Sequence, residues 1–96
     1  MIVLFVAHLG QIVATPGALI ALADTSPSTL LRRHASGDWG DLNAHDRAAN
    51  DAALRDGSRL LSAYLVAQGV KVWIITEAAD EDGHRAATTL LLPEEY

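Results

Sequence analysis

Two histidines and three aspartates lie close together in the sequence and carry side chains that can bind metal ions. They are His34, Asp38, Asp41, His45 and Asp46. Imidazole nitrogens and carboxylate oxygens form metal sites, so one hypothesis is a small metal-dependent hydrolase that uses both histidines with Asp38 and Asp41. The histidines lack the HExxH spacing of a zinc hydrolase. His45 falls beside the apolar stripe of a predicted helix, which favours a hydrogen-bonded core histidine.

The other residues that can do chemistry form no known catalytic motif. The chain contains no cysteine, which excludes thiolate nucleophiles and cysteine zinc sites. No serine lies in a G-x-S-x-G turn, and the glycine-rich motifs of nucleotide-binding proteins are missing. The acidic stretch Asp80–His84 lacks the ligand spacing of an EF-hand loop and is interpreted as an exposed turn. We therefore favour a non-enzymatic protein with no cofactor over the hydrolase.

The most distinctive passage, Ser36–Leu42 (SGDWGDL), places a tryptophan between glycines and aspartates. A tryptophan in a glycine-rich turn needs a surface to pack against, so the passage is either a fixed structural junction or a binding site. Aspartates recur along the helix predicted after it and can present negative charge. Aromatic residues surrounded by charge are typical of protein interfaces. The sequence therefore predicts that a protein partner binds at Asp38, Trp39, Asp41 and Asp46.

The composition restricts the class of protein. Of the 96 residues, 50% are hydrophobic and 20% are charged, which is typical of a single globular domain. The net charge of −5 argues against direct binding to nucleic acid. The apolar start, Met1–Ala7, is too short to span a bilayer and lacks the basic cluster of a signal peptide. We expect a cytoplasmic protein that does not bind a membrane.

Capping and turn residues divide the first two thirds of the chain into short elements. We expect strands at Ile2–Ala7 and Gly10–Ala14, which can pair as a hairpin through a tight turn. Three helices are predicted to follow, at residues 16–23, 27–35 and 44–56. Each is preceded by a residue that caps helix N-termini: Thr15, Ser26, and Asn43 or Asp41. Gly57 is expected to end the third helix.

The last third of the chain predicts an antiparallel meander. Strands at 58–67 and 70–77 are joined by a two-residue turn, Gln68–Gly69, and a strand at 86–92 ends at Pro93. This turn places Tyr64 opposite Trp73 on a sheet face that either helices or a partner must cover, and a homodimer through these two rings is one hypothesis. The predicted fold class is α+β: a short N-terminal strand or hairpin, three helices, and a three-stranded antiparallel meander with helices packed on one sheet face.

From Gly10 to Tyr96 the chain resembles a family of small "plasmid-related" proteins found on bacterial plasmids and other mobile elements. The stretches that carry the resemblance are Gly10–Leu19, Arg33–Leu42, Gly57–Tyr64, Val72–Ala78 and Thr88–Tyr96. The resemblance implies a setting on mobile elements and brings no established activity. Small acidic proteins in that setting often bind host defence proteins, so we expect a protein that inhibits or modulates a host defence or nucleic-acid-handling protein. The segment Met1–Leu9 and the loop Ala79–Arg85 depart from the family pattern, so the resemblance implies no function for them.

Overall fold

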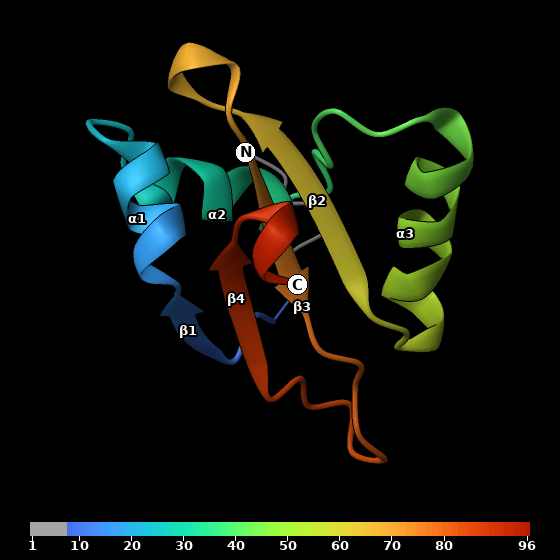
Figure 1. Cartoon of the computed structure of the whole chain (residues 1–96). Helices are drawn as coiled ribbons and strands as arrows, with labels where there is room; N and C mark the ends of the chain where they lie inside the picture. Colours follow the sequence, from blue (N-terminus) through green and yellow to red (C-terminus); the bar gives the residue numbers. More distant parts are fainter. Residues whose placement is uncertain (1–7) are drawn as a thin grey trace, which may run out of the picture.

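A mixed four-stranded sheet forms the centre of the protein, in a computed structural model that describes residues 8–96 (Figure 1). The strands are β1 (Gln11–Ala14), β2 (Leu60–Leu65), β3 (Lys71–Thr76) and β4 (Ala87–Leu91), in the order β1-β4-β3-β2. Strands β2, β3 and β4 form the predicted antiparallel meander. The sheet also contains β1, which pairs with β4 in parallel. The predicted strand Ile2–Ala7 lies outside the described residues.

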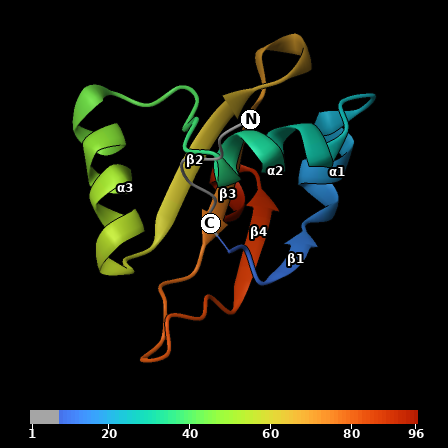
Figure 2. The same ribbon diagram turned by 180° about the vertical axis from the view of Figure 1, so that it is seen from behind.

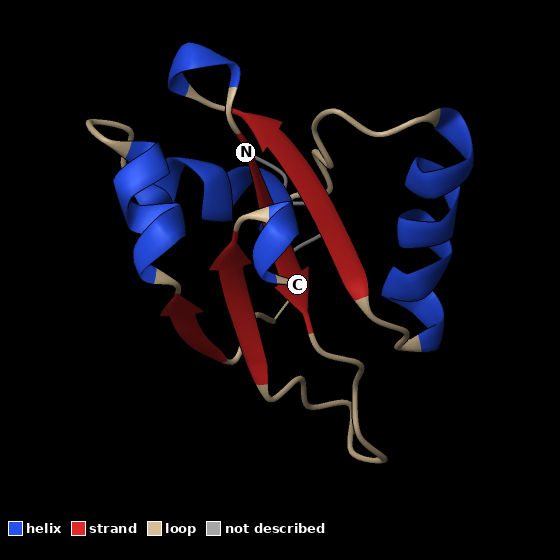
Figure 3. Cartoon of the chain, viewed as in Figure 1, coloured by secondary structure: helices blue, strands red, loops and turns tan. Residues whose placement is uncertain are grey.

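The three predicted helices are present, and local capping explains their starts. They are α1 (Pro16–Leu22), α2 (Pro27–Ala35) and α3 (Ala44–Asp56). The capping side chains are Thr15, Ser26 and Asn43, each of which accepts a backbone N–H of the first turn. Gly57 ends α3 in the left-handed region. Two short 3-10 turns, η1 (Ala67–Gly69) and η2 (Pro93–Glu95), complete the described chain (Figure 3).

Helices α1 and α2 cover one face of the sheet, and the C-terminal turn η2 lies against the other (Figures 1 and 2). The main core lies under α1 and α2. Its buried members are Ala18, Leu22, Leu30, Tyr64, Val72, Ile74 and Leu90. Helix α3 instead flanks the outer edge of β2. The prediction of helices on one sheet face thus describes α1 and α2, whereas α3 adds a separate layer at the sheet edge.

The register of the β2–β3 hairpin differs by one residue from the prediction. Three residues of η1 connect the strands instead of two, because Gln68 and Gly69 both adopt positive φ angles, of 63° and 72°. Tyr64 therefore pairs with Val72, and Trp73 pairs with Ala63. Side chains alternate between faces along a strand, so a slip of one residue separates the two rings. Tyr64 and Trp73 lie on opposite faces, and the predicted face that contains both does not form.

The outer edge of β2 is closed by side chain and backbone groups from α3 and the loop before it. The Asn50 side chain donates to the carbonyl of Leu61 (2.7 Å) and accepts its N–H (3.1 Å). Two residues further along β2, the N–H of Ala63 donates to the carbonyl of Trp39 (3.1 Å). A Cβ on Gly40 would lie 2.1 Å from the carbonyl oxygen of Ala63, so this close approach requires glycine.

Candidate functional site

Trp39 is a core residue and not a surface anchor. Only 3% of it is exposed, and it packs in a second core cluster with Ala53 and Leu60. Its indole N–H donates to the Asp51 carboxylate at 2.9 Å. The prediction that Trp39 contacts a partner is therefore wrong for this arrangement. The alternative of a fixed structural junction describes the residue, with Asp51 on α3 as its polar partner.

Asp38 and Tyr64 hold the same junction together from the other side. The Arg33 guanidinium binds the Asp38 carboxylate through two hydrogen bonds, at 2.6 and 3.2 Å, and this pairing lowers the pKa of Asp38. The Tyr64 hydroxyl donates to the Asp38 carbonyl at 2.6 Å. Burial raises the pKa of Tyr64 to about 12. Both predicted binding residues are thus occupied by contacts within the chain.

The remaining three predicted binding residues come together at an open groove between the start of α3 and the sheet. Its volume is about 540 Å³. The sheet supplies the floor, and the loop before α3 and the first turn of that helix supply one wall. The residues that the groove brings together are Leu61, Ala63, Trp73, Asp41, Asp46 and Lys71. We call this hollow the Trp73 groove. It lies on the sheet face opposite α1 and α2, because Trp73 and Ala63 form a cross-strand pair there.

The Trp73 groove continues into a smaller hollow of about 240 Å³, which Asp46 and Leu61 also line. Beyond the shared residues, this hollow adds Asn50 and Arg59. Arg59 donates to the Tyr96 hydroxyl at 2.5 Å, and the Tyr96 ring meets the Trp73 ring edge-on at 5.9 Å. An aromatic and basic rim therefore faces the acidic wall. Sequence reasoning missed this rim, because Arg59 and Tyr96 are 37 residues apart and meet only through tertiary structure.

The charges around the Trp73 groove are exposed and of both signs. Asp41 forms an ion pair with Lys71 at 3.3 Å, and about half of each side chain is exposed. Asp46 lies in the first turn of α3, where its negative charge is favoured by the helix dipole. An apolar floor with both signs of charge at its margin is the composition of a protein interface. The groove thus combines an apolar floor with exposed charges of both signs.

The buried histidine is His34, and not His45 as predicted. His45 is exposed on α3, whereas His34 is fully buried. Both ring nitrogens of His34 bond to hydroxyls, Nδ1 to Ser62 at 2.5 Å and Nε2 to Thr76 at 2.8 Å. The sequence does contain a signal for this position. His34 follows Leu30 by four residues on α2, and such residues share one helix face.

The hydroxyl chain around His34 fixes the position of its proton. Thr88 donates to the Leu9 carbonyl at 2.6 Å, so its single hydroxyl proton is committed. Thr76 must then donate to Thr88 (2.7 Å) and accept from Nε2–H of His34. The neutral ring carries its proton on Nε2, and Nδ1 accepts from Ser62. Burial, with a smaller contribution from Arg85, lowers the pKa of His34 to about 4.

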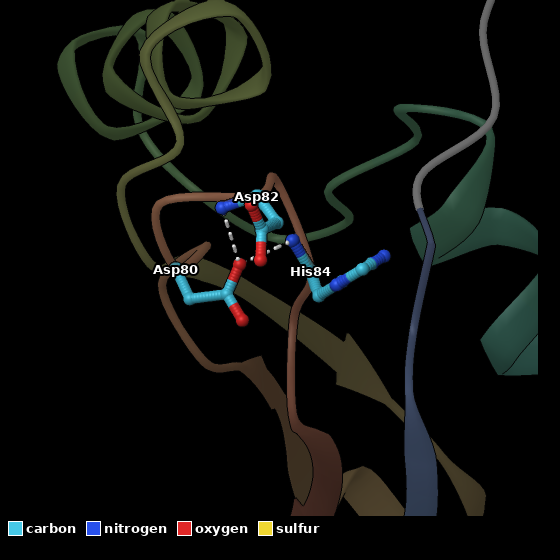
Figure 4. Close-up of side chains that lie close together, drawn as sticks. All are labelled: Asp80, Asp82 and His84. Atoms are coloured by element: carbon cyan, nitrogen blue, oxygen red, sulfur yellow. Dashed lines mark hydrogen bonds between the residues drawn. The ribbon is translucent and has the colours of Figure 1, made fainter.

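The four residues of the hydrolase hypothesis do not form a joint site. Among residues 8–96, one group of three or more histidine and carboxylate side chains comes close enough to share an ion, namely Asp80, Asp82 and His84 (Figure 4). All three are exposed. The Asp80 carboxylate accepts the backbone N–H groups of Asp82 and His84, each at 2.9 Å, and thereby folds the loop. This loop is the exposed acidic turn that the sequence predicts.

Comparisons with known proteins leave the resemblance to plasmid-related proteins as an expectation. The chain gives no significant match to a protein-family model, to a curated protein or to a solved structure. In residues 8–96 no helix has the length and apolar character needed to cross a membrane. The choice of the Trp73 groove as the candidate functional site therefore depends on its geometry alone.

Proposed function

We propose that this chain is a non-enzymatic binding protein, and that the Trp73 groove holds an extended segment of a protein partner. The observation that carries the proposal is the juxtaposition of Trp73 with Asp41 and Asp46 in one open groove. In the proposed complex an apolar partner side chain packs on Trp73. A basic side chain of the partner lies between the two carboxylates, where it takes over the contact that Asp41 makes with Lys71.

The chemistry of the groove favours a protein partner over a nucleic acid. The chain carries a net charge of −5, which repels phosphate backbones. The margin of the groove presents two carboxylates. Its two cations already have partners: Lys71 forms an ion pair with Asp41, and Arg59 donates to the Tyr96 hydroxyl. The hydrolase hypothesis gains no support, because His34 is sealed in the core with both nitrogens bonded.

The resemblance to plasmid-related proteins suggests which partner to expect. On this proposal the partner is a host defence or nucleic-acid-handling protein in the cytoplasm, which the chain inhibits or modulates. Such proteins carry basic surfaces because they bind phosphate backbones. An acidic chain is attracted to these surfaces over long range, and its groove then supplies the specific contacts.

Reversing the charge of the acidic wall is expected to weaken partner binding. In the double variant Asp41→Lys/Asp46→Lys, we expect the affinity for the captured host protein to fall by about tenfold or more, because two attractive charges become repulsive. Trp73→Ala should weaken binding by a comparable factor through loss of the apolar floor. The measurement is immobilised-chain capture from host lysate at low and high salt, followed by a binding titration with the purified partner.

The double variant Glu81→Lys/Asp82→Lys is the matched control, because both residues are exposed on the acidic loop and the pair undergoes the same change of charge. It should retain most of the affinity. Folding of every variant is checked by circular dichroism. Equal losses in Glu81→Lys/Asp82→Lys and in Asp41→Lys/Asp46→Lys would show that net charge, and not the groove, drives binding. Unchanged binding in all groove variants would reject the Trp73 groove.

A further inference from the structure

The two edge strands of the sheet, β2 and β1, differ in whether their outward backbone groups are hydrogen-bonded within residues 8–96. At the β2 edge, groups from Asn50 and Trp39 satisfy the outward backbone groups of Leu61 and Ala63. At the opposite edge, in residues 8–96, no strand pairs with the outer side of β1 (Figure 1). An open strand edge is a template for pairing with another chain.

The backbone of β1 shows which groups point outward. The N–H groups of Gln11 and Thr15 donate to the carbonyls of Ala86 and Leu90 on β4, at 3.0 Å each. Backbone groups alternate in direction along a strand, so those of Ile12 and Ala14 point away from β4. Within the described part of the chain, no hydrogen bond reaches these outward groups. Two N–H donors and two carbonyl acceptors at this edge therefore have no partner among residues 8–96.

Residues 8–10, which lead into β1, do not lie along its outer edge. Leu9 packs beside Trp39 and Leu60, and its carbonyl accepts the Thr88 hydroxyl. It thus lies on the inner side of β1, over the helix-covered face. Gly10 has a φ of 64°, and a Cβ there would lie 2.2 Å from the Arg85 carbonyl oxygen. The backbone at Gly10 therefore passes close to that of Arg85. The predicted hairpin between this strand and Ile2–Ala7 involves residues that lie outside the described part of the chain.

The edge carries apolar side chains and no charge. Ile12 and Val13 are 45% and 41% exposed, although both are β-branched and apolar. Neither β1 nor its neighbour β4 contains a charged residue, and none of the charged side chains that commonly protect strand edges is present in them. A partner strand gains no ion pair here. Two copies of a chain with net charge −5 repel one another, and an uncharged edge is where they can meet with least repulsion.

From this geometry we propose that β1 pairs with β1 of a second copy, antiparallel about a two-fold axis, and joins two sheets into one. The outward groups fit one register. Ile12 of each chain lies opposite Ala14 of the other, and the two N–H donors and two carbonyls on each side give four hydrogen bonds. Val13 then meets its counterpart on the axis. This edge is separate from the Trp73 groove, so dimer formation leaves the groove free.

The mass of the full chain in solution tests the proposal. Sedimentation equilibrium over a range of concentrations should approach twice the chain mass of 10.2 kDa. Val13→Lys places like charges opposite each other on the axis and is expected to weaken the dimer by about tenfold or more. Ile12→Pro removes an outward donor without removing a hydrogen bond to β4 and should act similarly. Leu65→Lys, at an apolar side chain that is 59% exposed on β2, is the matched control and should remain dimeric.

Amide hydrogen exchange gives a second measurement that does not depend on variants. The amides of Ile12 and Ala14 should become protected as the concentration rises, in step with the mass. A monomer at every concentration with both amides unprotected would overturn the proposal. Protection that is independent of concentration in a monomer would assign the edge to the chain's own N-terminal segment and would also overturn it. A dimer that survives both β1 variants would place the interface elsewhere.

Discussion

Replacing Trp39 with alanine is expected to lower the free energy of unfolding by about 3–5 kcal/mol, which is the usual cost of truncating a buried tryptophan. The ring fills the space between Ala53 and Leu60, and its N–H is the donor that satisfies Asp51. The change leaves a cavity that bridges α3 and β2. Urea denaturation followed by circular dichroism measures the loss.

Trp73→Ala is the matched control, because the same truncation falls on a half-buried ring at the groove. We expect a smaller loss of stability, about 1–2 kcal/mol, with a large loss of partner binding. The two tryptophans thus separate stability from binding. If Trp39→Ala does not fold, Trp39→Phe keeps most of the packing and tests the Asp51 hydrogen bond alone. A Trp39→Ala variant that folds with wild-type stability would contradict the packing that we describe.

The helices could be predicted from the sequence because their signals are local. A capping side chain, a proline in the first turn and a closing glycine act within a few residues, and α2 and α3 begin and end where these residues predict. The partner of β1 could not be predicted, because its pairing with β4 joins residues more than 70 positions apart. Such contacts depend on how the helices pack and leave no local signal.

The candidate site was predicted in part, and one residue in the η1 turn accounts for much of the difference. Gln68 adopts a positive φ that favours glycine or asparagine, and the sequence gives no indication of it. The resulting slip buries Tyr64 and turns Trp73 toward Asp41 and Asp46. The prediction therefore named three groove residues, but placed Trp73 beside the wrong ring. Lys71 was missed because its role depends on the same register.

The burial of His34 should make the protein sensitive to mild acid. The pKa of His34 is lowered from 6.5 to about 4 in the folded chain, chiefly by burial. As the pH falls below 6.5 the unfolded state takes up a proton first, so stability is lost between pH 6.5 and 4 and the loss then levels off. The expected loss is about 3 kcal/mol, at 1.4 kcal/mol for each unit of pKa difference. Urea unfolding at a series of pH values measures it.

Two comparisons assign this acid sensitivity to His34. Carboxylates with lowered pKa values, such as Asp38 and Glu95, lose their contributions only below 3.8 and 4.5, so most of the window belongs to the histidine. His34→Leu should lower stability at neutral pH, because Ser62 and Thr76 lose their partner, and should flatten the dependence on pH. The exposed His45→Gln variant should keep the wild-type dependence.

If His34→Leu fails to fold, NMR titration of the wild-type ring decides the question. A ring that titrates near 6.5 in the folded protein would show that the core does not exclude the charged form, whereas a midpoint near 4 would confirm that burial disfavours it.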